Sequence, residues 1–127
     1  MAEQIAKFRF IKYRILESSI KTNLAQDSDS QLSVNFKQTV GVDEGNHKMR
    51  LLFDTEIADE KKNIEIMVKA EGFFEFEQGL PEEQKERFFK INAPAILFPY
   101  VRAYISTLTA LSGINPITLP TLNLSQR

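Results

Sequence analysis

The sequence predicts an α+β fold in which the strands of a sheet come first and helices follow. Segments before residue 80 alternate apolar and polar residues with a period of two, which is typical of half-buried strands. Later segments carry the charge order and the apolar spacing of helices. The turns between the later strands are short and polar, and short turns favour antiparallel pairing.

Four segments within residues 5–78 carry the strand pattern: KFRFIKYRIL, QLSVNFKQTV, KMRLLFDTEI and NIEIMVKAEGFFEFE. The last three are separated by the polar turns GVDEGNH and DEKKN, whereas the link after the first strand, SSIKTNLAQDSDSQ, is longer. We expect this longer link to cross over an edge or an end of the sheet. Gly72 interrupts the last strand, and we expect a β-bulge there because glycine tolerates a positive φ.

Two helices are expected after the sheet, over about residues 81–90 and 95–112, followed by an extended tail over 114–127. Pro81 suits the first turn of the first helix, where acidic residues follow it and Lys90 comes late, as the helix dipole favours. Pro116 and Pro120 exclude a long helix in the tail. Residues 1–127 are therefore expected to form a single domain.

Composition excludes several classes of function. Sixteen basic residues balance seventeen acidic ones, so no overall field favours nucleic acid or an anionic membrane. The absence of cysteine excludes disulfides and thiolate metal sites. The N-terminus has no apolar run long enough for a signal peptide, so we expect a cytoplasmic protein. The apolar stretch 94–112 contains one charged residue, Arg102, but Pro99 and several hydroxyl groups argue against a membrane span.

The sequence contains no recognisable catalytic or metal-binding arrangement. His47, the only histidine, lies in a polar turn without a nucleophile nearby. The DSDS segment at residues 27–30 lacks the glycine and the glutamate that complete a calcium loop. Phosphate-binding loops and the motifs of metalloproteases and serine hydrolases are also absent. We therefore expect no enzymatic activity, no metal ion and no other cofactor.

The second expected helix is more apolar than one face of a small sheet requires. On a helical wheel its apolar residues span about 140°, against ~100° for an ordinary surface helix. We expect a second copy of the chain to cover the excess. The residues assigned to this oligomer interface are Val101, Ile105, Leu108 and Leu111. The ten phenylalanines cannot all point into one interior, and a minority is expected to line an apolar groove suited to extended polypeptide.

The segment PAILFPYVRAYISTLTALSGINPITLPTLNL resembles the signature region of the SecB protein-export chaperones. The matching residues are Pro94, Leu97, Phe98, Pro99, Tyr100, Arg102, Ile105 and Ser106, followed by Leu122, Asn123 and Leu124 in the tail. MVKAEGFFEF resembles the last strand of that family. The resemblance implies a four-stranded antiparallel sheet packed against a long helix, assembled as a dimer or a dimer of dimers. In that arrangement Pro99 falls in the first turn of the helix proper.

The resemblance also implies an ATP-independent holdase that binds unfolded polypeptide or preprotein in apolar surface grooves for protein export. We assign client binding to residues of the second strand, the link before it and the long helix: Leu24, Leu32, Val34, Phe36, Phe98, Tyr100 and Tyr104. The family uses acidic residues on the outer sheet face to contact the SecA motor. Glu17 keeps one of them, while Lys21 and Met67 occupy positions where the family carries acids. The family usually extends into a second helix and an acidic tail, whereas this sequence ends at Arg127.

Two other classes of function stay open. One is a SecB-like adaptor or antitoxin-associated chaperone that is dedicated to one partner. The other is a module that binds a small ligand or nucleic acid on the same scaffold. A pull-down dominated by one protein would favour the adaptor. Tight one-to-one ligand binding would favour a small-ligand module, and steep salt dependence would favour a module that binds nucleic acid.

Overall fold

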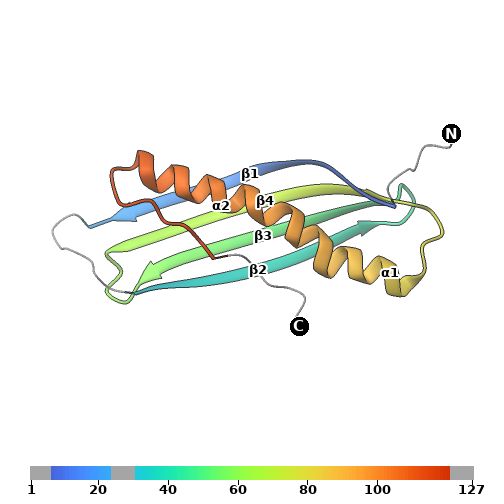
Figure 1. The fold of residues 1–127 in the computed structure, drawn as a ribbon, viewed down its shortest axis with the longest axis horizontal. Helices are drawn as coiled ribbons and strands as arrows, with labels where there is room; N and C mark the ends of the chain where they lie inside the picture. Colours follow the sequence, from blue (N-terminus) through green and yellow to red (C-terminus); the bar gives the residue numbers. More distant parts are fainter. Residues whose placement is uncertain (1–6, 24–30, 121–127) are drawn as a thin grey trace.

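A computed structural model of the chain describes residues 7–23 and 31–120. One antiparallel sheet contains β1 (Phe8–Thr22), β2 (Leu32–Asp43), β3 (Lys48–Asp59) and β4 (Ile64–Phe76), in the order β1-β4-β3-β2. The helical elements that follow are α1 (Glu82–Arg87), the π-helical turn η1 (Phe88–Asn92) and α2 (Ala93–Leu111). They cross one face of the sheet on a diagonal, from the β2 side to the β1 side (Figure 1). The predicted α+β fold, with a four-stranded antiparallel sheet and one long helix, is confirmed.

The strand order explains the unequal links between the strands. β2, β3 and β4 are consecutive in the chain and adjacent in the sheet, so each pair is joined by a short turn. His47 and Lys62, one in each turn, have positive φ values of 54° and 60°. β1 and β2 are the two edge strands, so the chain after Thr22 passes from one edge of the sheet to the other, as the length of its link predicts.

The expected bulge at Gly72 is wrong, and the irregularities lie in β1 instead. The register with β4 shifts between Phe10 and Lys12 and again between Ile15 and Glu17, while Gly72 pairs regularly on both sides. The glycine is needed for packing. A Cβ there would lie 3.1 Å from a ring carbon of Phe74 and 3.3 Å from a methyl group of Leu97, which is tighter than ordinary contacts. The missing side chain thus lets α2 approach β4.

The core lies between α2 and the inner face of the sheet, which we define as the face that α2 covers. β3 and β4 contribute most of the buried core residues, because they are the central strands and every second residue along each of them points toward α2. Fully buried residues of these strands include Met49, Leu51, Phe53, Ile57, Val68 and Phe74. Leu97, Val101 and Ile105 of α2 close the core from the other side.

The helical segment differs from the two separate helices that the sequence predicts. α1, η1 and α2 follow one another without a break from Glu82 to Leu111, and Pro99 lies inside α2 rather than in its first turn. Pro94 occupies the first turn of α2. A proline ring clashes with the carbonyl four residues earlier, which for Pro94 belongs to the widened π turn. The π turn therefore accommodates this proline without ending the helical run.

Residues 114–120 form an extended segment along α2, which we call the strap. It leaves the end of α2 and runs back across the helix side of the sheet toward β2 and β3 (Figure 1). Leu119 of the strap is 2% exposed and belongs to the core, and Ile117 packs against it. The remainder of the expected tail, residues 121–127, lies outside the described residues.

Within residues 7–23 and 31–120, none of the helices combines the length and the apolar character that crossing a bilayer requires.

Candidate functional site

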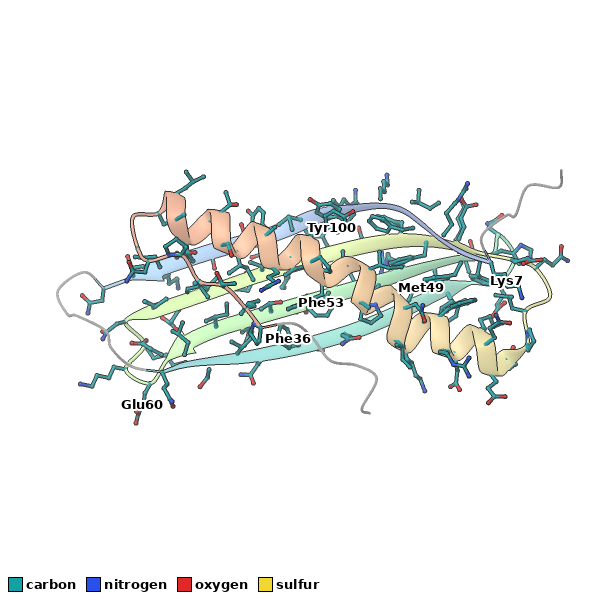
Figure 2. All side chains as sticks on the ribbon, viewed as in Figure 1. Lys7, Phe36, Met49, Phe53, Glu60 and Tyr100 are labelled. Atoms are coloured by element: carbon teal, nitrogen blue, oxygen red, sulfur yellow. The ribbon has the colours of Figure 1, made fainter. Side chains whose placement is uncertain are left out.

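The diagonal path of α2 leaves part of the inner face near the start of β1 only half covered. Four aromatic side chains lie there, and we call them the aromatic strip: Phe8, Phe10, Tyr13 and Tyr100. The Tyr13 and Tyr100 rings stack with their centroids 4.5 Å apart, and Phe10 lies 5.6 Å from Tyr100. Tyr100 extends from α2 beside β1 (Figure 2). The helix and the edge strand thus build one continuous aromatic surface.

The aromatic strip remains partly open to solvent. Tyr13 is 38% exposed and Tyr100 is 41% exposed, while Phe8 and Phe10 are half-buried. Phe8 stacks between Phe74 and Phe88, with centroid distances of 4.9 and 5.0 Å. Stacked rings of this kind have few accessible rotamers, so the surface is preorganised and loses little side-chain entropy when something binds it.

The opposite edge of the inner face carries a second apolar region along β2. Leu32, Val40 and Val42 are exposed, and Val34 and Phe36 are half-buried. The Phe36 ring packs edge-on against Phe98 at 5.6 Å, which anchors this edge strand to α2. The two edges of the sheet therefore both present apolar side chains on the helix side.

The strap shows how α2 holds an extended peptide. The Ser106 hydroxyl donates to the carbonyl of Ile117 over 2.9 Å, and the backbone N–H of Ile117 donates to Thr109 Oγ1 over 2.9 Å. Arg102 Nε donates to the carbonyl of Leu119. All three contacts use backbone atoms of the strap, so they do not depend on its side chains. Arg102 and Ser106 of the SecB-like segment thus have a structural role here.

The residues assigned to client binding have different positions. Tyr100 lies in the aromatic strip, and the half-buried Tyr104 has its hydroxyl 2.7 Å from the hydroxyl of Ser18. Leu32, Val34 and Phe36 lie along the β2 edge. Phe98 is only 3% exposed, because it packs against Phe36 and Phe53, so its assignment to an accessible groove is corrected. Leu24 lies outside the described residues.

The residues assigned to an oligomer interface need a similar correction. Val101 and Ile105 are fully buried against the sheet of their own chain, so they cannot also contact a second copy. The sheet covers this part of the helix because Gly72 allows the close approach of Leu97. Leu108 is half-buried and Leu111 is 83% exposed.

The side of α2 that faces away from the sheet is unusual for a solvent-exposed helix. Its exposed residues from the first to the last turn are small and uncharged, and we call them the small-residue stripe: Ala95, Pro99, Ala103, Thr107 and Ala110. A surface helix ordinarily carries charged residues on this side. The apolar excess of the helix therefore lies along this stripe and on the flank that carries Tyr100, away from Val101 and Ile105.

Sequence reasoning missed Phe8, Phe10 and Tyr13. The period-two alternation of the first strand already placed the two phenylalanines on one face, but alternation alone does not tell whether a helix covers that face.

Glu17, the candidate for motor docking, lies on the outer face of the sheet, where its carboxylate is 3.7 Å from Lys69 Nζ. Among the described residues, no group of three or more metal-ligating side chains comes together.

Comparison with known proteins agrees with this geometry. The family described as preprotein translocase subunit SecB matches residues 9–126. The uncharacterized protein MJ0357 of Methanocaldococcus jannaschii is 34% identical, over 79% of this chain and 67% of that protein. The protein-export protein SecB of Anaplasma phagocytophilum is 40% identical over 46% of this chain, and that of Orientia tsutsugamushi strain Boryong is 28% identical over 77%. The matches span 38% and 60% of those two SecB proteins.

Solved structures share the fold. The SecB-like chaperone Rv1957 of Mycobacterium tuberculosis, in complex with a ChAD peptide from the antitoxin HigA1, superposes with a TM-score of 0.76 at 15% identity. The similarity covers 92% of this chain and 88% of that chain. A protein of unknown function from Streptococcus agalactiae is more distant, with a TM-score of 0.52. The family match extends over nearly all of the sequence, and the chain belongs to the SecB family.

Proposed function

We propose that this protein is an ATP-independent holdase chaperone that binds unfolded polypeptide, including preproteins destined for export, in the cytoplasm. The observation that carries this proposal is the aromatic strip, a preorganised apolar surface that is partly open to solvent. Membership of the SecB family supports it. Binding of this kind requires no catalytic group and no cofactor.

The proposed mechanism is the sum of weak contacts along an extended client. Burying one apolar client side chain contributes roughly 1.5–3 kcal/mol, so a few such contacts on the aromatic strip bind weakly and reversibly. Leu32, Val40 and Val42 on the β2 edge add a second place for the same client. A chain that contacts both edges, or two copies of the protein, gains affinity through effective concentration.

Self-association is part of this proposal. We assign the interface to the small-residue stripe, because small side chains allow a second helix to approach closely and no charge has to be buried there. Leu111, at the end of the same helix, is the most exposed of the large apolar residues that the structure describes. A dimer or a dimer of dimers would multiply the number of aromatic strips that one client reaches.

The test is aggregation of a denatured model substrate. At stoichiometric amounts the protein should slow the aggregation, and the double variant Tyr13→Ser/Tyr100→Ser should lose most of this effect. The matched control, Tyr13→Phe/Tyr100→Phe, keeps both rings and should protect like the unmodified chain. Failure of the unmodified protein to slow aggregation would reject the holdase function, and full protection by the serine variant would reject the aromatic strip as its site.

A chaperone dedicated to one partner is the second candidate. It is favoured by the structural similarity to Rv1957, which was solved with a peptide from an antitoxin. If this candidate is right, a pull-down should contain one dominant protein instead of many unfolded chains. Docking of a SecA-type motor through Glu17 stays a prediction, and it concerns the outer face of the sheet, away from the aromatic strip.

A further inference from the structure

The outer face of the sheet, opposite α2, has a hollow of about 660 Å³ near the turn between β2 and β3. All four strands contribute to its lining, which includes Ile11, Lys12, Gly41, Lys48, Arg50 and Phe73. The proposed holdase function leaves this hollow unused, because the aromatic strip and the strap lie on the inner face.

Gly41 leaves the β2 end of the hollow open, because it carries no side chain. In the sheet register Gly41 lies opposite Arg50, Arg50 opposite Phe73, and Phe73 opposite Lys12, so one row of residues crosses the outer face. A Cβ on Gly41 would meet no atom within 4 Å. Neither a turn nor a positive φ requires glycine at this position. The row thus has an open space at one end, beside the long side chain of Arg50 and the ring of Phe73.

Two of the lysines around the hollow are not part of its ion pairs, so positive charge exceeds negative charge there. Arg9 forms an ion pair with Glu75. The carboxylate of Glu71, which is only 2% exposed, forms ion pairs with Arg14 at 2.7 Å and with Arg50 at 3.1 Å. Within the described residues, Lys12 and Lys48 have no carboxylate oxygen within 4.0 Å, although both line the hollow. Lys48 lies opposite two acidic residues in the sheet, Asp43 on β2 and Glu75 on β4. Asp43 accepts a hydrogen bond from the side chain of Asn46 at 2.9 Å, and Glu75 is paired with Arg9.

Phe73 supplies an apolar contact between these cations. The Lys12 ammonium lies 5.3 Å and the Arg14 guanidinium 5.4 Å from the centroid of its ring. Ile11, an extra residue at the first register shift of β1, is 44% exposed at the rim. The hollow therefore combines an apolar wall with local positive charge, on a chain whose formal net charge is −1.

We propose that this hollow, the Gly41 pocket, binds an acidic segment of a partner protein. One apolar side chain of the segment enters the space beside Gly41 and contacts Phe73, and carboxylates next to it pair with Lys12 and Lys48. Complementary charge of this kind gives specificity and speeds association more than it adds affinity, so the complex should be salt-dependent and readily reversible. Asp43 and Glu75 also line the hollow, so we expect only the carboxylates next to the apolar side chain to enter it, on the side of Lys12 and Lys48. A nucleic acid carries a charge at every phosphate and could not keep its backbone away from both carboxylates.

Binding of a fluorescein-labelled acidic heptapeptide, EDEFEDE, tests this proposal by fluorescence anisotropy at low and moderate salt. The unmodified chain should bind it saturably, and the basic peptide KRKFKRK should not bind. Gly41→Leu places an apolar side chain in the open space next to Gly41, where its Cβ meets no atom within 4 Å, and should weaken binding by a factor of about ten or more. Lys12→Gln and Lys48→Gln should each weaken it severalfold, and the matched control Lys37→Gln, on the same face but outside the hollow, should not.

Other outcomes overturn the proposal. Equal binding by Gly41→Leu and the unmodified chain would show that the hollow is not the site, and a labelled oligothymidylate that binds more tightly than the peptide would indicate nucleic acid instead. Loss of peptide binding in Tyr13→Ser/Tyr100→Ser would show that the peptide is merely a client. Gly41→Leu should still protect a denatured substrate from aggregation, so this proposal can fail while the holdase function stands.

Discussion

Gly72 is the residue at which the sheet and α2 come closest. Replacing it with alanine places a Cβ 3.1 Å from Phe74 and 3.3 Å from Leu97, both of which are buried in the core and cannot move freely. We expect Gly72→Ala to lower the free energy of unfolding by about 1–3 kcal/mol, the usual cost of overpacking. Urea denaturation measures this difference.

Gly41→Ala is the matched control for this substitution, because its added methyl group meets nothing within 4 Å. It should leave the free energy of unfolding unchanged or raise it slightly, since alanine restricts the unfolded chain more than glycine does. Equal losses of stability at the two positions would contradict a packing role for Gly72.

The pair of Arg9 and Glu75 makes a small part of the stability dependent on pH. A hydrogen bond from Arg9, opposed by desolvation and aided by the nearby charges of Arg9 and Lys48, lowers the pKa of Glu75 from its ordinary value of 4.5. A carboxyl group with a lowered pKa in the folded state stabilises the fold above the pKa of the unfolded chain. This stabilisation is lost as the pH falls below about 4.5 and through the pKa of the folded state.

The unmodified chain should therefore be more stable than Glu75→Gln at neutral pH, by an amount that stays constant down to about pH 5. Below pH 4.5 the two stability curves should converge. Urea denaturation between pH 7 and pH 3 checks this. A constant difference over the whole range would mean that the variant acts through something other than the charge of Glu75.

At the scale of elements, Thr109 joins α2 to the strap. Its buried hydroxyl lies 2.8 Å from the carbonyl of Ile105, to which it donates, and it accepts the N–H of Ile117. Thr109→Val keeps the shape of the side chain but leaves the partly buried N–H of Ile117 without its acceptor, which costs about 0.5–1.5 kcal/mol. We expect faster amide hydrogen exchange at Ile117 and easier proteolysis of the strap, with little change in the central strands.

Thr107→Val, two residues earlier on the exposed side of α2, is the control for this experiment. It changes the same chemical group, and the described hydrogen bonds to the strap come from Arg102, Ser106 and Thr109 instead, so the exchange rate at Ile117 should stay as in the unmodified chain. Similar exchange rates in all three proteins would mean that the strap is held by Leu119 and not by hydrogen bonds.

At the scale of the whole molecule, the small-residue stripe is expected to join copies of the chain. Ala103→Glu places a charge in the middle of the stripe, where burial without a partner is unfavourable. Native mass measurement should give a dimer or tetramer for the unmodified chain and a smaller species for the variant. Thr39→Glu, on the outer face of β2, should leave the mass unchanged. A monomeric unmodified chain at micromolar concentration would contradict the proposed interface.

Much of the architecture could be predicted, because the signals for it are local. The alternation of Leu32, Val34 and Phe36 marks a strand wherever that strand finally pairs. The residues of the candidate site were harder to predict from the sequence. Burial of Phe98, Val101 and Ile105 depends on how far the sheet reaches under α2, and exposure of Phe10 and Tyr13 depends on where the helix crosses it. No periodicity within one element carries that information.

The sequence by itself determined the strands, their short turns, the greater length of the link after the first strand and the SecB-like segment, because each is a property of neighbouring residues. Only the tertiary structure decided that Gly72 serves packing, that Arg102 and Ser106 hold the strap, and that the open apolar surface lies along β1. The physical reason is that these three features depend on the diagonal angle at which α2 lies on the sheet. That angle results from contacts between residues far apart in the chain.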